Sequence, residues 1–382
     1  MNFNIIIPTR DRPNNIIKII KNIGDLNLSP EYIIIIDDSR NEMNSIHLEK
    51  IINSSKKIRI KLLNKKNVNH LFKNKKTSYI GLGKRGHNLG NARNLGLIYS
   101  FVLSGYNVIN LLIDDDMELN ESIKHILDIN PKNTLAKIEL GGSPDLSRLE
   151  WIQFFLKSNK PSILIKNSYI NKLVKVLDKR SFLLLNKYTD LKIPSIKKNL
   201  DIIRIPQREE LSGGCCVFSS NLILLDLFPN WFDEDWCLFD KLRRNHHVKI
   251  IKSKINVCHN SLKKNILNLD LMLFEERGKI LTNALKKMNL LRIKKFDTKK
   301  LLILEIMERI EIINSVILVA DHSLQNNLFK RKILNKLLDL KREVQKLDPN
   351  DLLEEIEKFI DFEKHFKQDI KKNLNPIKED EN

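Results

Sequence analysis

Short apolar runs alternate with amphipathic stretches over the first 120 residues of the chain. Apolar runs at residues 3–7, 32–36, 58–63 and 107–113 predict strands. Helices are predicted after Pro13, where isoleucines recur at helical spacing, over residues 43–52 and in the stretch that ends near residue 104. Strands that alternate with helices in this way are typical of an α/β fold with a parallel, doubly wound sheet.

The pattern is less regular after residue 120. Further strands are predicted at residues 137–145, 210–220, 248–251 and 255–258, and further helices at residues 146–157 and 231–240. From about residue 262 onward glycine and proline become scarce, and apolar residues recur at helical spacing. We therefore expect a first domain over residues 1–261 and a helical appendage over residues 262–382.

Three consecutive carboxylates, Asp114, Asp115 and Asp116, end the fourth predicted strand. Open α/β sheets bind their ligands at the carboxyl ends of the strands. Because side chains alternate along an extended chain, Asp114 and Asp116 can face the same way, and two converging carboxylates favour a hard cation such as Mg²⁺ or Mn²⁺. The alternative is that Asp116 caps a helix beginning near residue 121, with its neighbours solvated.

Composition adds a strong positive charge to this picture. The 382 residues include 66 Lys and Arg against 47 Asp and Glu, a formal net charge of +19, and 42% are hydrophobic. Such a charge favours nucleotide phosphates, nucleic acid or an anionic membrane surface as partners, although an AT-rich coding sequence would produce a similar lysine excess. Nucleic acid is not expected, because the basic residues are dispersed and aromatic residues rarely lie among them.

Cysteine usage and the missing apolar segments bear on the compartment. Four cysteines without disulfide-framework spacing indicate reduced thiols in a cytosolic setting. Neither a signal segment nor an apolar run of membrane-spanning length is present in the sequence. We expect a cytoplasmic protein that can touch the inner face of the membrane.

Five segments, in this order, resemble those of the GT-A-type nucleotide-sugar glycosyltransferases, most of all family 2. They are Pro-Thr-Arg-Asp-Arg-Pro at 8–13, Ile-Ile-Asp-Asp-Ser at 35–39, Gly-Asn-Ala-Arg-Asn-Leu-Gly at 90–96, Leu-Ile-Asp-Asp-Asp at 112–116 and Phe-Asp-Glu-Asp-Trp at 232–236. The resemblance covers residues 2–261 and not the helical tail. It departs from the family at Arg12 and Pro13 and in the basic stretch near His70, and residues 145–206 match no known segment.

This resemblance implies a donor site at the ends of the first, second and fourth strands. Pro8, Thr9 and Arg10 would form the nucleotide-contacting turn, and Asp38 would contact the base or the ribose, unless it is only a turn or N-cap acid. The acid triplet would be the DxD motif, with Asp114 and Asp116 on the metal and Asp115 near the donor. The nucleotide-binding half would be residues 1–119 and the acceptor half residues 120–261.

Basic and acidic residues outside the strand ends complete the implied site. Arg85, His87 and Arg93 lie in a glycine-rich approach to a helix, which suits phosphate oxygens, although such glycines also form ordinary turns. Some related enzymes place a histidine late in the domain, which makes His259 a candidate third metal ligand; a solvated histidine after a strand is the alternative.

The acidic pair Glu234 and Asp235 is the candidate catalytic centre. In inverting members of the family an aspartate at this point accepts the acceptor's proton, which implies Asp235 as the base and Glu234 as its neighbour. The alternative is that these residues are first-turn acids that favour the helix dipole.

The sequence thus predicts a metal-dependent, inverting glycosyltransferase with a nucleotide-diphosphate sugar as donor, a UDP-sugar being favoured. The acceptor would be a glycan, a lipid-linked saccharide or a peptide, and the C-terminal helices could mediate a homodimer or contact with anionic lipid. Two alternatives are an inactive scaffold with the same fold and a basic nucleic-acid-binding protein.

Overall fold

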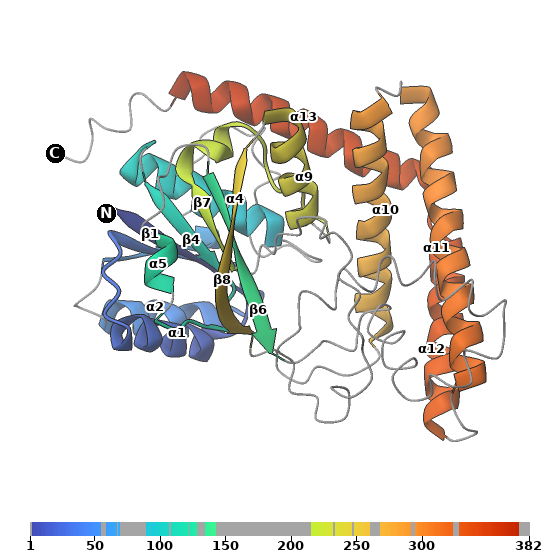
Figure 1. Ribbon diagram of the computed structural model, residues 1–382, viewed down its shortest axis with the longest axis horizontal. Coiled ribbons are helices and arrows are strands. Elements are labelled where there is room, and N and C mark those ends of the chain that lie inside the picture. The colour runs from blue at the N-terminus through green and yellow to red at the C-terminus, as the bar shows by residue number, and fades with distance from the viewer. Residues whose placement is uncertain are drawn as a thin grey trace. The chain divides into compact units, whose positions relative to one another are not determined.

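The computed structural model describes residues 2–54, 59–66, 68, 89–106, 108–121, 123–127, 134–142, 215–231, 234–246, 248–259, 268–291, 295–323 and 328–373. The chain divides into two compact units. The first comprises Met1–Leu140, Leu211–His259 and Glu357–Asn382, and the second comprises Gly141–Glu210 and Asn260–Ile356. Figure 1 gives the labels of the helices and strands used below.

The first unit is built on a mixed sheet whose N-terminal half is parallel. Its strands are β1 (Phe3–Thr9), β2 (Tyr32–Asp37), β3 (Ile60–Leu63) and β4 (Ile109–Ile113), in the order β3-β2-β1-β4. All three ladders between them are parallel. The strands are rich in isoleucine and leucine because both faces of a parallel sheet are covered by helices.

The other half of the sheet continues from β4 with antiparallel pairs. Its strands are β5 (Met117–Glu118), β6 (Thr134–Gly142), β7 (Cys215–Ser219) and β8 (Lys249–His259), in the order β7-β6-β8-β5. Strand β7 pairs antiparallel with both β4 and β6, and β5 pairs antiparallel with β8. The chain therefore returns beside β4, next to the edge where the acid triplet lies.

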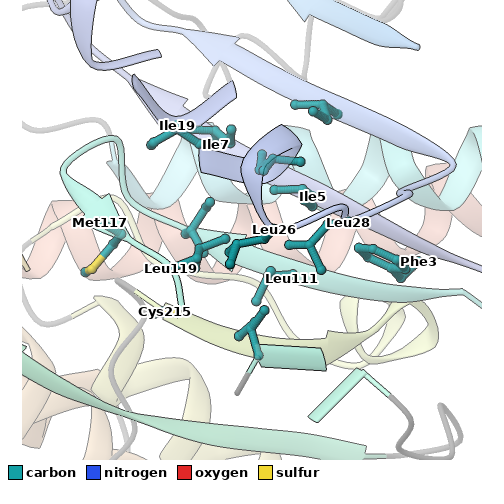
Figure 2. Packing of buried hydrophobic residues seen from close by; sticks show 14 of the residues in the cluster. Phe3, Ile5, Ile7, Ile19, Leu26, Leu28, Leu111, Met117, Leu119 and Cys215 are labelled. Atoms are coloured by element: carbon teal, nitrogen blue, oxygen red, sulfur yellow. The ribbon is translucent and has the colours of Figure 1, made fainter. Parts of the chain in front are cut away.

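Helices cover the two faces of the parallel half. Isoleucines of α1 (Pro13–Asp25) pack with Ile5, Ile7 and Leu111 of the strands, as Figure 2 shows, and α2 (Glu42–Ser54) lies beside α1. Successive strand residues face opposite sides, so Ile6 meets α4 (Leu89–Ser104) instead, at Gly96. The short helices α5 (Ile123–Leu127) and η2 (Ser220–Leu224) and the longer α9 (Glu234–His246) complete the unit up to β8.

A line of buried polar side chains fixes α4 on the sheet. The Asn4 amide donates to Ser100 Oγ at 2.7 Å, Ser100 hydrogen-bonds Asn110 of β4, and Asn110 donates to Ser220 Oγ at 2.9 Å. All four residues have no exposed surface. A buried polar group is costly in free energy unless it is hydrogen-bonded. These bonds therefore fix the position of α4 along the sheet, because a shift of the helix would break them.

The C-terminal part of the chain is helical. It contains α10 (Leu269–Leu291), α11 (Lys295–Ser323), α12 (Leu328–Gln345) and α13 (Pro349–Asn373). In the second unit, α10, α11 and α12 pack against one another, and an ion pair between Glu276 of α10 and Arg309 of α11 is buried among their apolar side chains. The residues of α13 from Glu357 on belong to the first unit.

The predicted fold class is confirmed. A Rossmann-like sheet flanked by helices, with helices at the C-terminus, is what the GT-A resemblance implied. The two short strands expected at 248–251 and 255–258 are instead one strand, β8, because the polar residues between them continue the extended chain. Within the described ranges no helix is both long and apolar enough to cross a bilayer.

Replacing Gly96 with alanine should destabilise the protein by about 1–3 kcal/mol, because a Cβ there would lie 2.3 Å from the Cγ2 methyl of the fully buried Ile6. Gly24→Ala in α1 is the matched control, since its Cβ would meet nothing within 4 Å and the change should stabilise by about 0.5–1 kcal/mol. Guanidinium denaturation measures both, and equal effects of the two variants would contradict the packing of α4 on β1.

Candidate functional site

Polar side chains gather where β1, β2 and β4 end. Thr9 ends β1, Asp37 ends β2 and Asp114 follows β4. The backbone N–H of Asp38 donates to the Thr9 carbonyl at 2.9 Å, which extends the β1–β2 ladder into the loops. Because these strands are parallel neighbours, their carboxyl ends form one edge, the place where open α/β sheets bind ligands.

Arg10 and Asp38 form an ion pair at this edge, with the aspartate buried and the arginine partly exposed. Asp11, in the loop that follows β1, adopts a left-handed conformation with φ 56° and contacts the loop that follows β2. Its carboxylate accepts the backbone N–H groups of Arg40 at 3.2 Å and Asn41 at 3.0 Å. Burial would raise the pKa of Asp11, but these donors hold it below its ordinary value.

The acid triplet lies in a turn and not in extended chain. Strand β4 ends at Ile113, and the Met117 N–H donates to the Asp114 carbonyl at 3.2 Å. The expectation from alternating side chains therefore does not apply: Arg12 lies 2.9 Å from Asp115 and 3.5 Å from Asp116, while Asp114 pairs with Arg93.

Asp115 joins the ends of β1 and β4. Its carboxylate accepts the Thr9 hydroxyl at 2.7 Å and a guanidinium N–H of Arg12 at 2.9 Å, and the residue is 6% exposed. Burial raises its pKa, and Arg12 and Thr9 offset this only in part. The middle carboxylate of the triplet is thus tied into the protein, and its predicted contact with the donor stays a prediction.

Arg93 of α4 brings the acid triplet and the acidic start of α9 together. Its guanidinium donates to Asp114 at 2.8 Å and forms an ion pair with Glu234, and its side chain is only 2% exposed. Burial would lower the pKa of Arg93, but Asp114, Glu234 and Asp235 outweigh burial and raise the pKa above its ordinary value. The guanidinium therefore keeps its charge. Two candidate regions 120 residues apart in sequence therefore meet around one buried cation.

The segment at 90–96 packs α4 against the loop that precedes α9. A Cβ on Gly90 would lie 2.0 Å from the Pro229 carbonyl oxygen, so only glycine allows this close approach. The Asn94 amide donates to the Phe228 carbonyl at 2.8 Å and accepts the Phe228 N–H at 2.9 Å. The Phe228 ring lies under the Arg93 guanidinium, 5.7 Å from centroid to Cζ.

The oxygen donors at the triplet fit a divalent cation that a substrate helps to coordinate. Among the described residues no three His, Cys, Asp or Glu side chains are grouped to hold a metal. Mg²⁺ and Mn²⁺ are often held by one or two carboxylates together with substrate phosphates, so the assignment of Asp114 and Asp116 as metal ligands does not need a third protein ligand and stays a prediction. The backbone of His259 in β8 lies opposite Met117, the residue after Asp116.

Several predicted residues lie elsewhere or outside the described residues. Pro8 is buried within β1, and Arg85 and His87 lie outside the described part of the chain. No role was predicted for Arg12. Its position in the sequence, in the loop after β1 and directly before the proline that begins α1, could have drawn attention to it.

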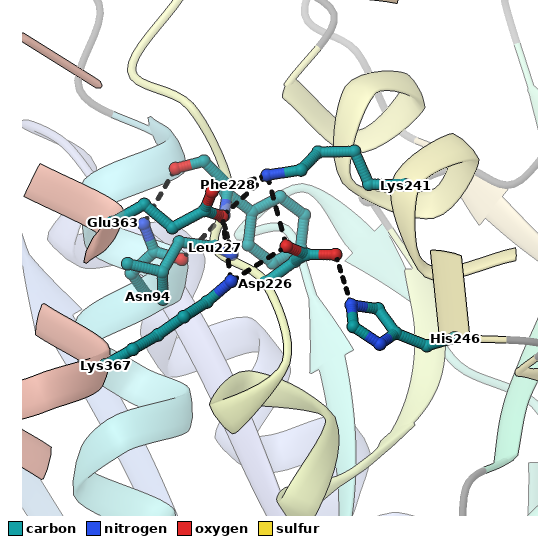
Figure 3. A network of polar contacts seen from close by, with 8 residues as sticks. All are labelled: Asn94, Asp226, Leu227, Phe228, Lys241, His246, Glu363 and Lys367. Carbon is teal, nitrogen blue, oxygen red and sulfur yellow. Dashed lines mark hydrogen bonds and ion pairs between the residues drawn. The ribbon is translucent and has the colours of Figure 1, made fainter. Parts of the chain in front are cut away.

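The last turns of α13 hold the loop before α9, a role that helical periodicity alone did not suggest. Figure 3 shows the network of eight residues: Asn94, Asp226, Leu227, Phe228, Lys241, His246, Glu363 and Lys367. Glu363 of α13 accepts the Leu227 N–H at 2.9 Å and pairs with Lys241 of α9 at 2.6 Å. The Trp231 and Phe359 rings pack edge to face, 5.2 Å between centroids.

Asp226 is the buried anion at the centre of this network. It lies 3.2 Å from Lys241, 3.0 Å from Lys367 and 3.1 Å from His246 Nε2. Burial would raise its pKa, but Lys241 and Lys367 outweigh burial and hold the pKa below its ordinary value. The start of α9, where Glu234 and Asp235 lie, is therefore braced by α4 on one side and by α13 on the other.

No protein-family model and no curated protein sequence matches this chain. Solved structures with a similar fold include a mannosyltransferase, PcManGT from Pyrobaculum calidifontis in complex with GDP-Man and Mn²⁺, at TM-score 0.45 and 11% identity over 94% of this chain and 85% of that one. The M. tuberculosis glucosyl-3-phosphoglycerate synthase has TM-score 0.41 and 14% identity over 74% and 79%. S. aureus TarS 1-349 in complex with UDP has TM-score 0.36 and 14% identity over 96% and 92%. Because each score is below 0.5, a functional proposal has to rest on this chain's own residues.

Glu363→Gln should lower the free energy of unfolding by about 1–3 kcal/mol, because it leaves the buried Lys241 without its closest carboxylate. Asp361→Asn removes an exposed carboxylate from the same helix and should change it by less than about 0.5 kcal/mol. Thermal denaturation compares the two, and an unchanged melting temperature in Glu363→Gln would rule out this brace.

Proposed function

We propose that this protein is a metal-dependent glycosyltransferase that moves a sugar from a nucleotide-diphosphate donor to an acceptor hydroxyl. The observation that carries the proposal is the meeting of Asp114 and Glu234 around the buried Arg93, beside the Asp38 edge of the sheet. The first unit would thus contain side chains suited to bind the nucleoside, to bind the diphosphate with its metal and to activate the acceptor.

The donor nucleoside would lie at the ends of β1 and β2. The Asp38 carboxylate is an acceptor for ribose hydroxyls or a base N–H, and in the free protein Arg10 neutralises it. Asp114 and Asp116 would hold Mg²⁺ or Mn²⁺, which when bound neutralises the negative charge growing on the leaving diphosphate. A UDP-sugar is the favoured donor.

Asp235 is the better candidate for the general base, in an inverting transfer. Glu234 is 4% exposed and its carboxylate is engaged by Arg93, whereas Asp235 is half-buried in the next position of the same helical turn. Arg93 would hold Glu234 and Asp114 in place while Asp235 accepts the proton of the acceptor hydroxyl. Dimerisation through the C-terminal helices and contact with anionic lipid remain predictions from the sequence alone.

A donor panel tests the proposal directly. UDP-, GDP-, CMP- and dTDP-sugars are compared by thermal shift with Mn²⁺ or with EDTA, and one nucleotide should stabilise the protein, by about 2.7 kcal/mol at a hundredfold excess over Kd, only with the metal. Asp116→Asn should abolish this shift, and the exposed Asp361→Asn should not. No shift with any nucleotide, but stabilisation by an oligonucleotide in low salt, would favour the nucleic-acid-binding alternative.

Asp235→Asn should lower kcat at least about a hundredfold and leave the donor-induced thermal shift intact, because the amide cannot accept the proton yet keeps the side chain's size. Sugar transfer or donor hydrolysis under saturating donor measures the rate. A variant that keeps the wild-type rate would remove Asp235 from the mechanism, and full loss of the thermal shift would instead place it in donor binding.

A further inference from the structure

Arg12 is a second arginine at the acid triplet, beside Asp115 and Asp116. It occupies the N-cap position of α1 directly before Pro13, at the end of the loop that leaves β1, and its side chain makes no capping hydrogen bond. Its Nη1 lies 2.9 Å from Asp115 Oδ1 and 3.5 Å from Asp116 Oδ2, and its side chain is 28% exposed. A guanidinium thus stands beside the carboxylate that the divalent cation would need.

The two arginines at the triplet differ in their freedom to move. Arg93 is 2% exposed and is engaged by Asp114, Glu234 and the Phe228 ring, so it cannot leave without depriving the buried Glu234 carboxylate of its cation. Arg12 has solvent on one side and a long flexible stem. Its contact with Asp115 is short, whereas its contact with Asp116 is longer and therefore easier to give up.

We propose that Arg12 is an exchangeable counter-ion of the donor site. It neutralises Asp116 in the free protein, and it turns the N–H groups that face Asp116 to the donor's diphosphate when Asp116 binds the divalent cation. This role rests on the proposed function and extends it to how the empty and loaded states of the same site are balanced.

Elementary electrostatics favours this exchange. A guanidinium and a divalent cation on the same carboxylate repel each other, so Arg12 weakens cation binding as long as it stays on Asp116. The guanidinium carries five N–H donors in a fixed fork, and Asp115 occupies only one side of it. The diphosphate brings the anionic oxygens that replace Asp116, so cation and diphosphate would bind cooperatively.

Two binding measurements test the exchange without relying on turnover. Binding of Mn²⁺ alone is followed by electron paramagnetic resonance of the free ion, and binding of UDP and of GDP in saturating Mn²⁺ by calorimetry. Arg12→Gln should bind Mn²⁺ alone about fivefold more tightly, because a competing charge is gone, and bind the diphosphate at least about tenfold more weakly. Arg12→Lys keeps the charge without the fork, so it should retain the wild-type Mn²⁺ affinity and still lose part of the diphosphate affinity.

The opposite changes expected for the Mn²⁺ affinity and the diphosphate affinity of Arg12→Gln separate this role from a merely structural one. Arg59→Gln removes an exposed arginine of the same unit and should change neither affinity. If Arg12→Gln weakens both ligands, or leaves Mn²⁺ binding unchanged, while the wild-type protein binds both, the exchange is wrong and the donor site stands. If the wild-type protein binds neither Mn²⁺ nor either diphosphate, the donor site itself is wrong and this role falls with it. Circular dichroism confirms that the variants are folded, and Arg12→Lys supplies the comparison if Arg12→Gln is not.

Discussion

The pairing of buried Arg93 with carboxylates from two other elements is the constraint on which the candidate site depends. Removing a guanidinium from water costs several kcal/mol, and only close, well-aligned anions offset that cost. Asp114 after β4 and Glu234 at the start of α9 supply them. Each of the three elements therefore fixes the others, and the acids of the triplet and of α9 cannot drift apart without stranding a buried charge.

Helix α4 transmits this constraint to the rest of the first unit. One side of the helix reaches the sheet through Gly96 and Ser100, and another reaches the loop before α9 through Gly90 and Asn94. These four residues look unrelated in the sequence, but each allows or directs a close approach of α4 to a neighbouring element. The motif at 90–96 is explained by packing as much as by any contact with a nucleotide.

Local patterns in the sequence were sufficient for the sheet and its helices. Buried parallel strands are apolar on both faces, so β1, β2 and β4 stand out as short runs of isoleucine and leucine. Position in the sequence likewise placed Asp38 and Asp114 directly after β2 and β4, where the structure has them. The sequence could not indicate that the triplet lies in a turn, because alternation holds only while the chain stays extended.

Long-range ion pairs were the other part that the sequence did not reveal. Arg12 meets Asp115 across about a hundred positions, and Glu363 meets Lys241 across 122. A charged residue on a helix has the same sequence pattern whether its side chain faces solvent or an ion-pair partner far along the chain. The helical periodicity of α13 therefore predicted a helix but not its ion pairs. Which carboxylate pairs with which cation is decided by the topology of the sheet, which no local window contains.

The bond between Glu363 and the Leu227 N–H has a consequence for how the protein is made. Domains tend to fold in order as the chain emerges during synthesis. The loop before α9, however, is held by Glu363, which lies more than 130 residues downstream of Leu227. The sheet can form early, whereas the start of α9 can be fully braced only after α13 has been translated. The acids that the proposed chemistry requires would then be among the last parts of the first unit to reach their final positions.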